Sequence, residues 1–425
     1  MNRTRLSGMA ARLSVLSAFT ITARFVGHAE AHEPPFGTGV YTSDAGLVVR
    51  MSRGLVLRSS ERLEYRLVCN EALGVAEYDT PSVLVREDRS LLVGTSTGLR
   101  HVSADGCEIE LSQAFGDTRV SALVRDPNDS ARVYAATDLG FYESRDHGEH
   151  FDLLDSHVFD SLEAPEGADD VVIAAGKLGA PGHVQAYIAR WRSAAPLELQ
   201  ELALDQNEYG VALLGSDADH VIAVARAYLG TQYPDRFLVS SDGARSWQSP
   251  MSAPGIAAFA VDARNGAWIV GDAAGLWRTS SSGEPTAQLG TAAVSCLAQA
   301  GSDLFICDGV GAEGGVSLSA DGGEHARSLL RWNQVTGLAA CAADAPSVQQ
   351  CHVAWGDWTR ELPPGAPLLE DELQGTPDAG NTLSGASPAS GCAAVGGNHN
   401  TGVPLGLALL FMLITRRLQA KRSYP

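Results

Sequence analysis

A short polar turn that recurs along the chain constrains the fold more than any other feature of this sequence. Written as Ser-x-Asp-x-Gly-x-x-aromatic, it is complete at Ser144, Asp146, Gly148 and Phe151. Serine and aspartate side chains hydrogen-bond to nearby backbone groups, and glycine adopts positive φ, so such a turn keeps one shape. We interpret it as a hairpin loop whose aromatic residue returns to the apolar layer.

Partial copies of the turn repeat at intervals near 40 residues. Two of them each lack one residue of the pattern: Ser240, Asp242 and Trp247, with Ala244 in place of glycine, and Ser319, Asp321 and Gly323, without the aromatic. Fainter copies begin at Ser60, Ser103 and Ser280. Successive aspartate-equivalent positions lie 39 to 45 residues apart, except for one step of 96, which equals two units of 48. One unit, around residues 190–197, has therefore lost its turn and kept its length.

Short apolar runs precede the turns, for example at 91–95, 133–137, 268–271 and 304–307. Runs of four to six aliphatic, aromatic and β-branched residues bounded by turn residues predict strands. A repeat of about 40 residues with several strands is typical of propeller blades. We therefore predict an all-β fold for residues 32–363, a β-propeller of seven or eight four-stranded blades. A closing segment or truncated eighth unit is expected from residue 335.

The turn resembles the Asp-box, or bacterial neuraminidase repeat, of β-propellers such as sialidases, sortilin-type receptors and the photosystem II assembly factor family. The resemblance covers residues 36–363. It implies that each turn lies between the third and fourth strands of a blade, away from the ligand-binding central face. Asp146, Asp242 and Asp321 are accordingly expected to form turns and not to catalyse a reaction.

The two ends of the chain differ from the repeat region. Residues 1–31 contain three early arginines, an apolar run and a small-x-small segment ending at Ala31, which predicts a secretory signal cleaved there. Residues 364–391 are rich in Pro, Gly, Ser and Ala, which predicts a flexible linker. Residues 392–425 contain Cys392, a short apolar helix over 403–414 and a basic end.

This tail resembles the MYXO-CTERM sorting signals of myxobacterial surface proteins. The resemblance implies that the tail is removed and that Cys392 carries a lipid. A plain tail anchor is the alternative. Either interpretation places the propeller outside the cell, anchored to the bacterial surface or outer membrane through its C-terminal region.

The charge of the chain is strongly acidic. The first 31 residues contain four Arg and one Glu, and the last 33 contain four basic residues and no acid, so the segment between has a net charge of −26. Nucleic acid is an unsuitable partner because its affinity comes largely from Lys and Arg. We expect a monomer.

Seven cysteines in an exported chain predict disulfides. With Cys392 assigned to the anchor, six remain. Cys296 and Cys307 are 11 residues apart and Cys341 and Cys351 are 10 apart, so each pair is expected to join the first two strands of a blade. Cys69 with Cys107 follows by elimination.

A sialidase-like glycoside hydrolase is the enzyme that the turns suggest. The Arg-Ile-Pro motif of those enzymes is absent from the sequence, and no pair of Tyr and Glu stands out as a nucleophile. His147 and His150 flank Glu149 in a turn, and residues 126–129 resemble a calcium loop, but tight turns explain both. We assign no catalytic residue, no cofactor and no metal ligand.

The remaining interpretation is a binding module. A closed propeller presents loops and a central opening to a ligand, and the linker would carry it above a membrane. The loop from Ala225 to Arg236 is the longest insert and contains Tyr228 and Tyr233. We expect an extracellular protein or glycan as the partner.

Overall fold

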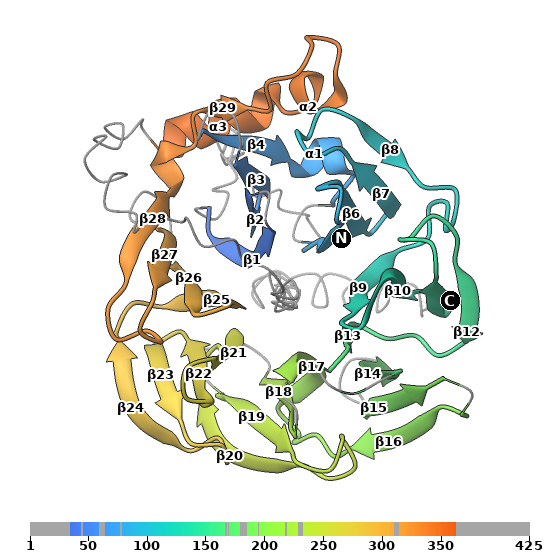
Figure 1. Cartoon of the computed structure of the whole chain (residues 1–425), viewed down its shortest axis with the longest axis vertical. Coiled ribbons are helices and arrows are strands. Elements are labelled where there is room, and N and C mark those ends of the chain that lie inside the picture. The colour runs from blue at the N-terminus through green and yellow to red at the C-terminus, as the bar shows by residue number, and fades with distance from the viewer. Residues whose placement is uncertain are drawn as a thin grey trace, which may run out of the picture. The chain divides into compact units, whose positions relative to one another are not determined.

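The computed structural model describes residues 35–362, except 44–45, 59–63, 77–78, 166–167, 169, 179–184, 194, 217–218, 228–232 and 310–313. Its strands form seven sheets that are arranged as the blades of a propeller (Figure 1). The predicted all-β propeller is confirmed, with seven blades. The signal segment, the linker, the tail, Ala31 and Cys392 lie outside the described residues.

Each blade consists of four consecutive antiparallel strands. The first two blades are β1 (Gly37–Ser43), β2 (Gly46–Met51), β3 (Gly54–Arg58) and β4 (Tyr65–Cys69), then β5 (Ser82–Val85), β6 (Leu91–Thr95), β7 (Gly98–Val102) and β8 (Ile109–Leu111). Blades 3 and 4 are β9 (Val120–Asp126), β10 (Asp129–Thr137), β11 (Gly140–Ser144) and β12 (Asp152–Asp155), then β13 (Ser161–Glu163), β14 (Val171–Leu178), β15 (Gln185–Arg192) and β16 (Glu198–Leu202).

The last three blades follow the same plan. Blade 5 is β17 (Glu208–Ser216), β18 (Val221–Ala227), β19 (Asp235–Ser240) and β20 (Gln248–Ala253), and blade 6 is β21 (Ala258–Asp262), β22 (Ala267–Asp272), β23 (Gly275–Thr279) and β24 (Pro285–Gly290). Blade 7 is β25 (Val294–Ala300), β26 (Asp303–Asp308), β27 (Gly315–Ser319) and β28 (Arg327–Arg331). Blade 4 is the unit that has lost the turn and kept its length, as the spacing predicts.

The core lies in the seams between blades, because the two faces of every blade are apolar. In β14, Val172 and Ala174 pack into the seam with blade 3, and Ile173 and Ala175 pack into the seam with blade 5. This alternation follows from the two-residue period of a strand. The first strand of each blade also contacts the first strand of the next, around the whole ring from β1 to β25 and back to β1.

Blades 7 and 1 meet through side chains at the point where the ring closes. All four strands of blade 1 come from residues 37–69, so the C-terminal end of the repeat region does not complete that blade. The seam between blades 7 and 1 is filled by one apolar cluster, to which Trp332 and Trp358 contribute fully buried indoles. The Ser295 hydroxyl also donates a hydrogen bond across this seam to the Gly37 carbonyl, at 2.7 Å.

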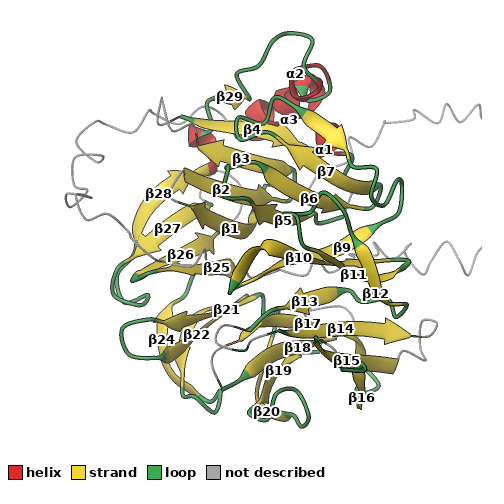
Figure 2. Cartoon of the chain, turned by 45° about the vertical axis from the view of Figure 1, so that its right-hand side comes forward, coloured by secondary structure: helices red, strands yellow, loops and turns green. Residues whose placement is uncertain are grey.

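Residues 332–362, which we call the closing segment, lie against blade 1. They contain η2 (Trp332–Gln334), β29 (Gly337–Leu338), α2 (Pro346–Gln349) and α3 (His352–Glu361). The two-residue strand β29 pairs in parallel with β4, and Figure 2 shows the helices beside that edge of the blade. The predicted eighth unit is therefore a short strand and two helices.

Three disulfides join the six cysteines of the described residues. The predicted Cys296–Cys307 bond is confirmed, and the two residues are opposite each other in β25 and β26. The predicted pairs Cys341–Cys351 and Cys69–Cys107 are wrong. Cys351 is bonded to Cys69, and Cys341 to Cys107, with Cα–Cα distances of 5.4 and 5.3 Å.

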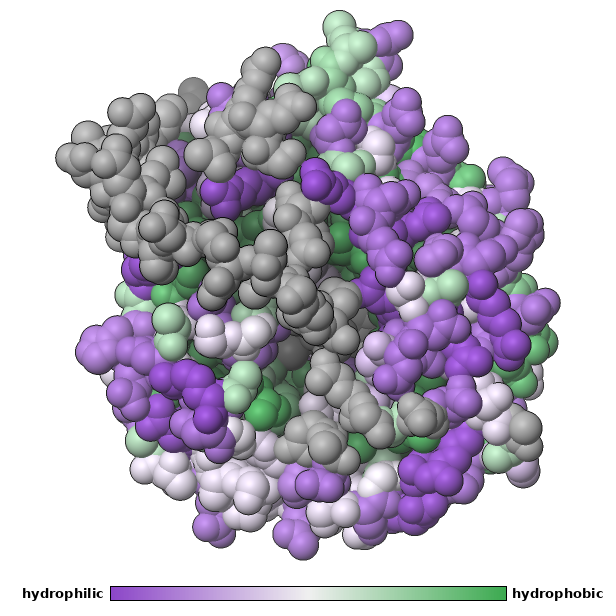
Figure 3. Space-filling view, in the orientation of Figure 1, coloured by the Kyte–Doolittle hydropathy of each residue, from purple (hydrophilic) through white to green (hydrophobic). Residues whose placement is uncertain are grey.

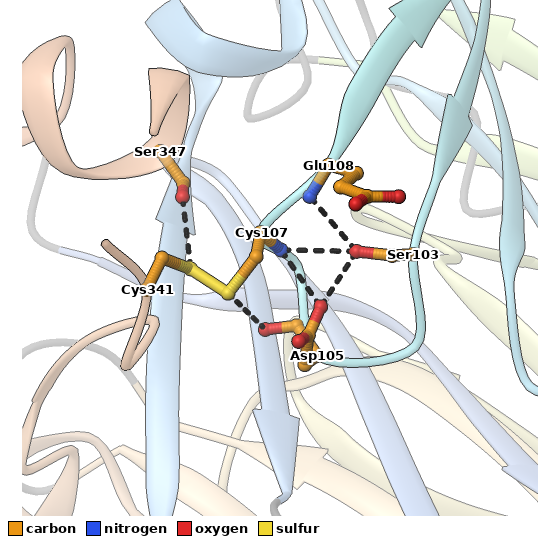
Figure 4. The surroundings of a disulfide bond; sticks show 6 residues. All are labelled: Ser103, Asp105, Cys107, Glu108, Cys341 and Ser347. Atoms are coloured by element: carbon orange, nitrogen blue, oxygen red, sulfur yellow. Dashed lines mark hydrogen bonds between the residues drawn. A yellow bond between two sulfur atoms is a disulfide. The ribbon is translucent and has the colours of Figure 1, made fainter. Parts of the chain in front are cut away.

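The error has a structural cause. A spacing of ten residues suits a disulfide only if the intervening chain forms a hairpin, and Cys341 and Cys351 flank the short helix α2 instead. Pro346 at the first turn of α2 suits a helix start. The closing segment therefore presents its two cysteines to different blades: Cys351 to the end of β4, and Cys341 to the β7–β8 turn (Figure 4).

Hydrophilic residues cover much of the rim on the face shown in Figure 3, particularly over blades 2 and 3. Among the described residues, none of the helices has the length and apolar composition of a membrane span.

Candidate functional site

The connections between strands lie at two opposite ends of each blade. Antiparallel order puts the first-to-second and third-to-fourth connections at one end, which we call the turn rim. The second-to-third connections and the passages from one blade to the next lie at the other end, which we call the entry rim. These two rims hold the polar groups that the described residues offer to a ligand.

The Ser-x-Asp turns lie on the turn rim, each between the third and fourth strands of its blade. In blade 3, the Ser144 hydroxyl donates to Asp146 Oδ1 at 2.8 Å and accepts from the Gly148 N–H at 2.9 Å. The same Asp146 oxygen accepts from the backbone N–H of Glu149 and His150. These bonds use the carboxylate to hold the loop.

The other two turns repeat this geometry. Ser240 and Ser319 each donate to the following aspartate, Asp242 and Asp321, at 2.8 Å. In all three turns the residue after the aspartate has positive φ, including the non-glycine His147 at 62°. Ala244 occupies the glycine position of the pattern with a φ of 70°, so it adopts the left-handed conformation in spite of its Cβ.

The aromatic positions contribute to the seams. Phe151 packs against Phe115 from the passage between blades 2 and 3, with ring centroids 4.8 Å apart. Trp247 packs against the apolar cluster between blades 4 and 5. Both residues therefore join the turn of one blade to the preceding blade.

The histidine-rich turn of blade 3 does not gather its side chains around one point. His150 Nδ1 lies 2.7 Å from Asp146 Oδ2, whereas Glu149 reaches Arg86 of blade 2 at 3.0 Å. Asp321, Glu324 and His325 are close enough together to hold a cation, but Glu324 pairs with Arg278 at 3.0 Å. The Asp126 carboxylate accepts from the Asn128 N–H within its own turn and also pairs with Arg132.

Tyr134 and Glu143 are cross-strand neighbours in blade 3, the residue types of a sialidase nucleophile pair. Both are buried, and Arg132 lies 3.1 Å from the Glu143 carboxylate. Burial raises the pKa of Tyr134, which opposes formation of a phenolate nucleophile. This group therefore stabilises blade 3 from within and is not open to a substrate.

The entry rim of blades 4 and 5 carries a different set of groups. Lys177, near the end of β14, places its ammonium 3.9 Å from the Asp160 carboxylate and 5.7 Å from the ring centroid of Tyr209. Asp160 belongs to the passage from β12 to β13, and Tyr209 to β17. The Lys177 side chain is 45% exposed, so the ammonium remains accessible beside an acid and an aromatic face.

Tyr187 and His157 continue this group on the blade 4 side. The Tyr187 hydroxyl donates to the Val158 carbonyl, and its ring lies 6.4 Å from that of His157. Burial, followed by the carboxylates of Asp160 and Asp155, raises the pKa of Tyr187 to about 12. The phenol is therefore neutral at physiological pH and acts as a hydrogen-bonding group.

We call Asp155, His157, Asp160, Lys177, Tyr187 and Tyr209 the entry cluster. It combines a cation, carboxylates, an imidazole and aromatic faces, which is a set suited to polar ligands that also present apolar surface. Sequence reasoning missed it, because its members come from four separate segments. One signal was available: Lys177 and Lys421 are the only lysines of the chain.

The loop expected to contact a partner lies on the same rim. Tyr233 is 37% exposed beside the start of β19, in the second-to-third connection of blade 5. Tyr228 lies outside the described residues. The predicted contact role of this loop remains a prediction.

No protein-family model and no curated protein matches the chain. Among solved structures, it is similar to a gluconolactonase from Xanthomonas campestris, at 18% identity and a TM-score of 0.38, over 65% of this chain and 92% of that one. It is also similar to the GH74 xyloglucanase of Xanthomonas campestris, at 12% identity and a TM-score of 0.40, over 69% and 67% of the two chains. The GH74 enzyme of Niastella koreensis is similar at 11% identity and a TM-score of 0.35, over 73% of this chain and 74% of that one. Likeness at this level transfers neither an activity nor a substrate to this chain.

Proposed function

We propose that this protein is an exported surface propeller that binds a glycan or protein partner through the entry cluster. The observation that carries the proposal is the exposed Lys177 ammonium, held between the Asp160 carboxylate and the Tyr209 ring. A lysine in this setting donates to hydroxyl or carbonyl groups, while the aromatic ring packs against apolar CH surface. A glycan offers both, and it is the partner that this set of groups favours.

The disulfides support the exported part of the proposal. Three disulfides are typical of an oxidising compartment outside the cytosol. The signal segment 1–31 and the Cys392 tail, as expected from the sequence, would deliver the propeller to the surface and anchor it there. Mass spectrometry of the mature protein tests this: processing after Ala31 and a lipid on Cys392 would support it, and an intact tail would contradict the lipid.

The rarity of lysine makes a direct binding test possible. An amine-acetylating reagent can modify only Lys177, Lys421 and the chain N-terminus. We expect a bound glycan to protect Lys177 from acetylation, measured by mass spectrometry of the peptide that contains it. Lys421, where the tail is retained, and the N-terminus serve as internal controls because they lie outside the propeller.

Variants then connect protection to affinity. Lys177→Met and Tyr209→Ala should each weaken glycan binding on an array by about tenfold or more, since each removes one side of the site. Arg360→Met, on the exposed side of α3, is the matched control. A ligand that binds all three variants equally would place the binding surface elsewhere.

A glycoside hydrolase is the second candidate. Asp155 and Asp160 both belong to the entry cluster, and glycosidases use two carboxylates as acid and as nucleophile or base. If the protein hydrolyses its glycan, Asp160→Asn should abolish release of reducing ends while binding persists. Binding without release in the unmodified protein supports the binding module.

A further inference from the structure

A small cavity opens on the turn rim between blades 4 and 5, at the opposite end of the blades from the entry cluster. It has a volume of about 160 Å³. On the blade 4 side it is lined by β15 and β16, and on the blade 5 side by the Ser240 turn: Ile188, Arg190, Glu198, Leu199, Gln200 and residues 243–245. Blade 4 is the blade that has lost the recurring turn, and blade 5 carries the Ser240 turn, in which Ala244 replaces the glycine.

Arg190 in this cavity has one unsatisfied guanidinium nitrogen. The side chain is half-buried, and its Nη1 lies so close to Gly243 that a Cβ there would approach it to 2.7 Å. Its Nε is buried without a hydrogen-bond partner, as is the Nε of Arg278 in blade 6, so the difference between the two arginines lies in their ion pairs. Within the described part of the chain, no carboxylate forms an ion pair with Arg190.

The neighbouring charges increase this imbalance. Glu198 is opposite Arg190 in the β15–β16 ladder, but its carboxylate lies 3.4 Å from Arg245. Burial, followed by the positive charges of Arg192 and Arg245, lowers the pKa of Arg190. The carboxylates of Glu198 and Asp242 act in the opposite direction. The charged residues that line the cavity are two arginines and one glutamate, within a segment whose net charge is −26.

The seam between blades 6 and 7 shows which group Arg190 lacks. Arg278 in blade 6 occupies the position of Arg190: each is opposite an isoleucine, Ile269 or Ile173, that packs into the seam with the following blade. Arg278 receives a carboxylate from that next blade, because Glu324 stands three residues after Asp321 and lies 3.0 Å away.

In the seam between blades 2 and 3, Glu149, three residues after Asp146, also pairs with a cation of the preceding blade, but this cation is Arg86 in the β5–β6 connection, 3.0 Å away. The position of Arg190 is occupied there by His101, which is opposite Leu92 and lies 3.9 Å from Glu149. The corresponding residue after Asp242 is Arg245. Blade 5 therefore presents a cation where blades 3 and 7 present a carboxylate. The turn of blade 5 supplies no glutamate to Arg190.

We propose that this cavity binds an oxyanion carried by a ligand, a carboxylate or a sulfate group, which takes the place of the missing glutamate beside Arg190 and Arg245. A guanidinium donates two parallel hydrogen bonds to such a group. The exposed Leu199 adds apolar contact at the mouth of the cavity. An acidic saccharide, either a uronate or a sulfated sugar, has this chemistry. The site is independent of the entry cluster.

Calorimetry on the full chain at constant ionic strength tests the proposal, with sodium glucuronate, sodium sulfate and glucose as probes. We expect saturable one-to-one binding of glucuronate, of sulfate or of both, and no binding of glucose. Stronger binding of one anion would identify the group the cavity prefers. The proposal is wrong if neither anion binds at a concentration of about 10 mM, because a dissociation constant above that value is weaker than is typical for a metabolite.

Variants locate the binding. Arg190→Gln should weaken it by about 10- to 100-fold, because a charged hydrogen bond is lost, and Arg245→Gln should weaken it less. Arg245 is half-exposed, so its replacement leaves folding intact and provides a second test if Arg190→Gln is unstable. Arg360→Gln, a distant exposed arginine, controls for net charge. Anion binding that Arg190→Gln and Arg245→Gln both leave unchanged would overturn the assignment.

A separate variant keeps this test distinct from the proposed function. Lys177→Met should leave anion binding at the cavity unchanged, whereas it removes the cation of the entry cluster. Loss of anion binding in Lys177→Met would move the anion site to the entry rim and contradict the cavity.

Discussion

At the scale of single residues, the aspartates of the recurring turns carry the local order of the turn rim. Each carboxylate accepts a hydrogen bond from a serine hydroxyl and from one or more backbone N–H groups, so the polar groups of the loop are satisfied within the loop. In blade 5 the Ser246 hydroxyl adds a further bond to Asp242 Oδ2 at 2.7 Å. Hydrogen bonds to a carboxylate favour its charged form, so these aspartates are strong acids in the folded protein.

The acid strength of Asp242 gives a prediction about pH. The hydrogen bond from the Ser246 hydroxyl, with those from Ser240 and from the backbone N–H groups of the turn, lowers the pKa of Asp242 to about 2. A carboxylate whose pKa is lower in the folded than in the unfolded state stabilises the fold above its unfolded pKa, and that stabilisation is lost as the pH falls through the folded value. Asp242→Asn should therefore cost about 1 kcal/mol of unfolding free energy at pH 7.

The difference between the wild type and Asp242→Asn should narrow as the pH falls from about 4 to about 2. Chemical denaturation at a series of pH values measures it. Ser246→Ala is a useful comparison, because it removes one hydrogen bond and keeps the carboxylate. The pH dependence of its unfolding free energy should lie between those of the wild type and Asp242→Asn. A difference that stays constant down to pH 2 would contradict the shifted pKa.

At the scale of elements, each turn also joins its blade to the one before it. Gly148 and Gly323 would place a Cβ at 2.4 and 2.7 Å from leucines of the preceding blade, Leu92 and Leu276, so the turns pack tightly into the seams. Glu149 and Glu324 add ion pairs across those seams. In blade 2, Cys107 stands where the turns of blades 3 and 7 have this glycine, and its disulfide joins the turn to the closing segment (Figure 4).

The Cys107–Cys341 bond should be a strong constraint on that segment. It spans 234 residues, and a crosslink over a long loop removes much of the freedom of the unfolded chain. Replacing both residues by alanine should lower the free energy of unfolding by about 3–5 kcal/mol, measured by chemical denaturation.

Peptide mapping without reduction checks the connectivity in the same material. The fragment containing Cys107 should be linked to the one containing Cys341, and Cys69 to Cys351. A fragment that links Cys69 to Cys107 would contradict the arrangement of the closing segment.

At the scale of the whole molecule, closure of the ring depends on the seam between blades 7 and 1. Packing of Trp332, Trp358 and their neighbours holds the two ends of the repeat together, beside the β29–β4 pairing and the two disulfides of the closing segment. Arg53 of blade 1 also pairs with Glu361 of α3 at 2.7 Å. A partly exposed pair of this kind contributes little, so the apolar cluster provides most of the noncovalent stability of the closure.

Trp358→Ala should therefore cost about 3–5 kcal/mol of unfolding free energy. Hydrogen exchange should increase most in β1–β4 and β25–β28, next to the opened seam, and least in β13–β16 on the far side of the ring. Val353→Ala, on the exposed side of the same helix, is the control and should be nearly neutral. Uniform exchange across all blades would show that this seam has no special part in closure.

The sequence by itself determined the blade architecture. The alternation in strands such as β14 and the Ser-x-Asp turns act over a few residues, so their period reports the number and kind of units directly. The Cys296–Cys307 bond was predictable for the same reason, because it lies within one hairpin.

Tertiary structure alone decided how the ring closes and which polar groups meet. Cys69 and Cys351, or Asp160, Lys177 and Tyr209, come together only because blades distant in the sequence lie side by side in a circle. Nothing local to Arg190 shows that the turn of the next blade offers Arg245 where other blades offer glutamate. Local hydrogen bonding and strand periodicity are written in short stretches of sequence, whereas contacts across seams depend on how whole blades pack.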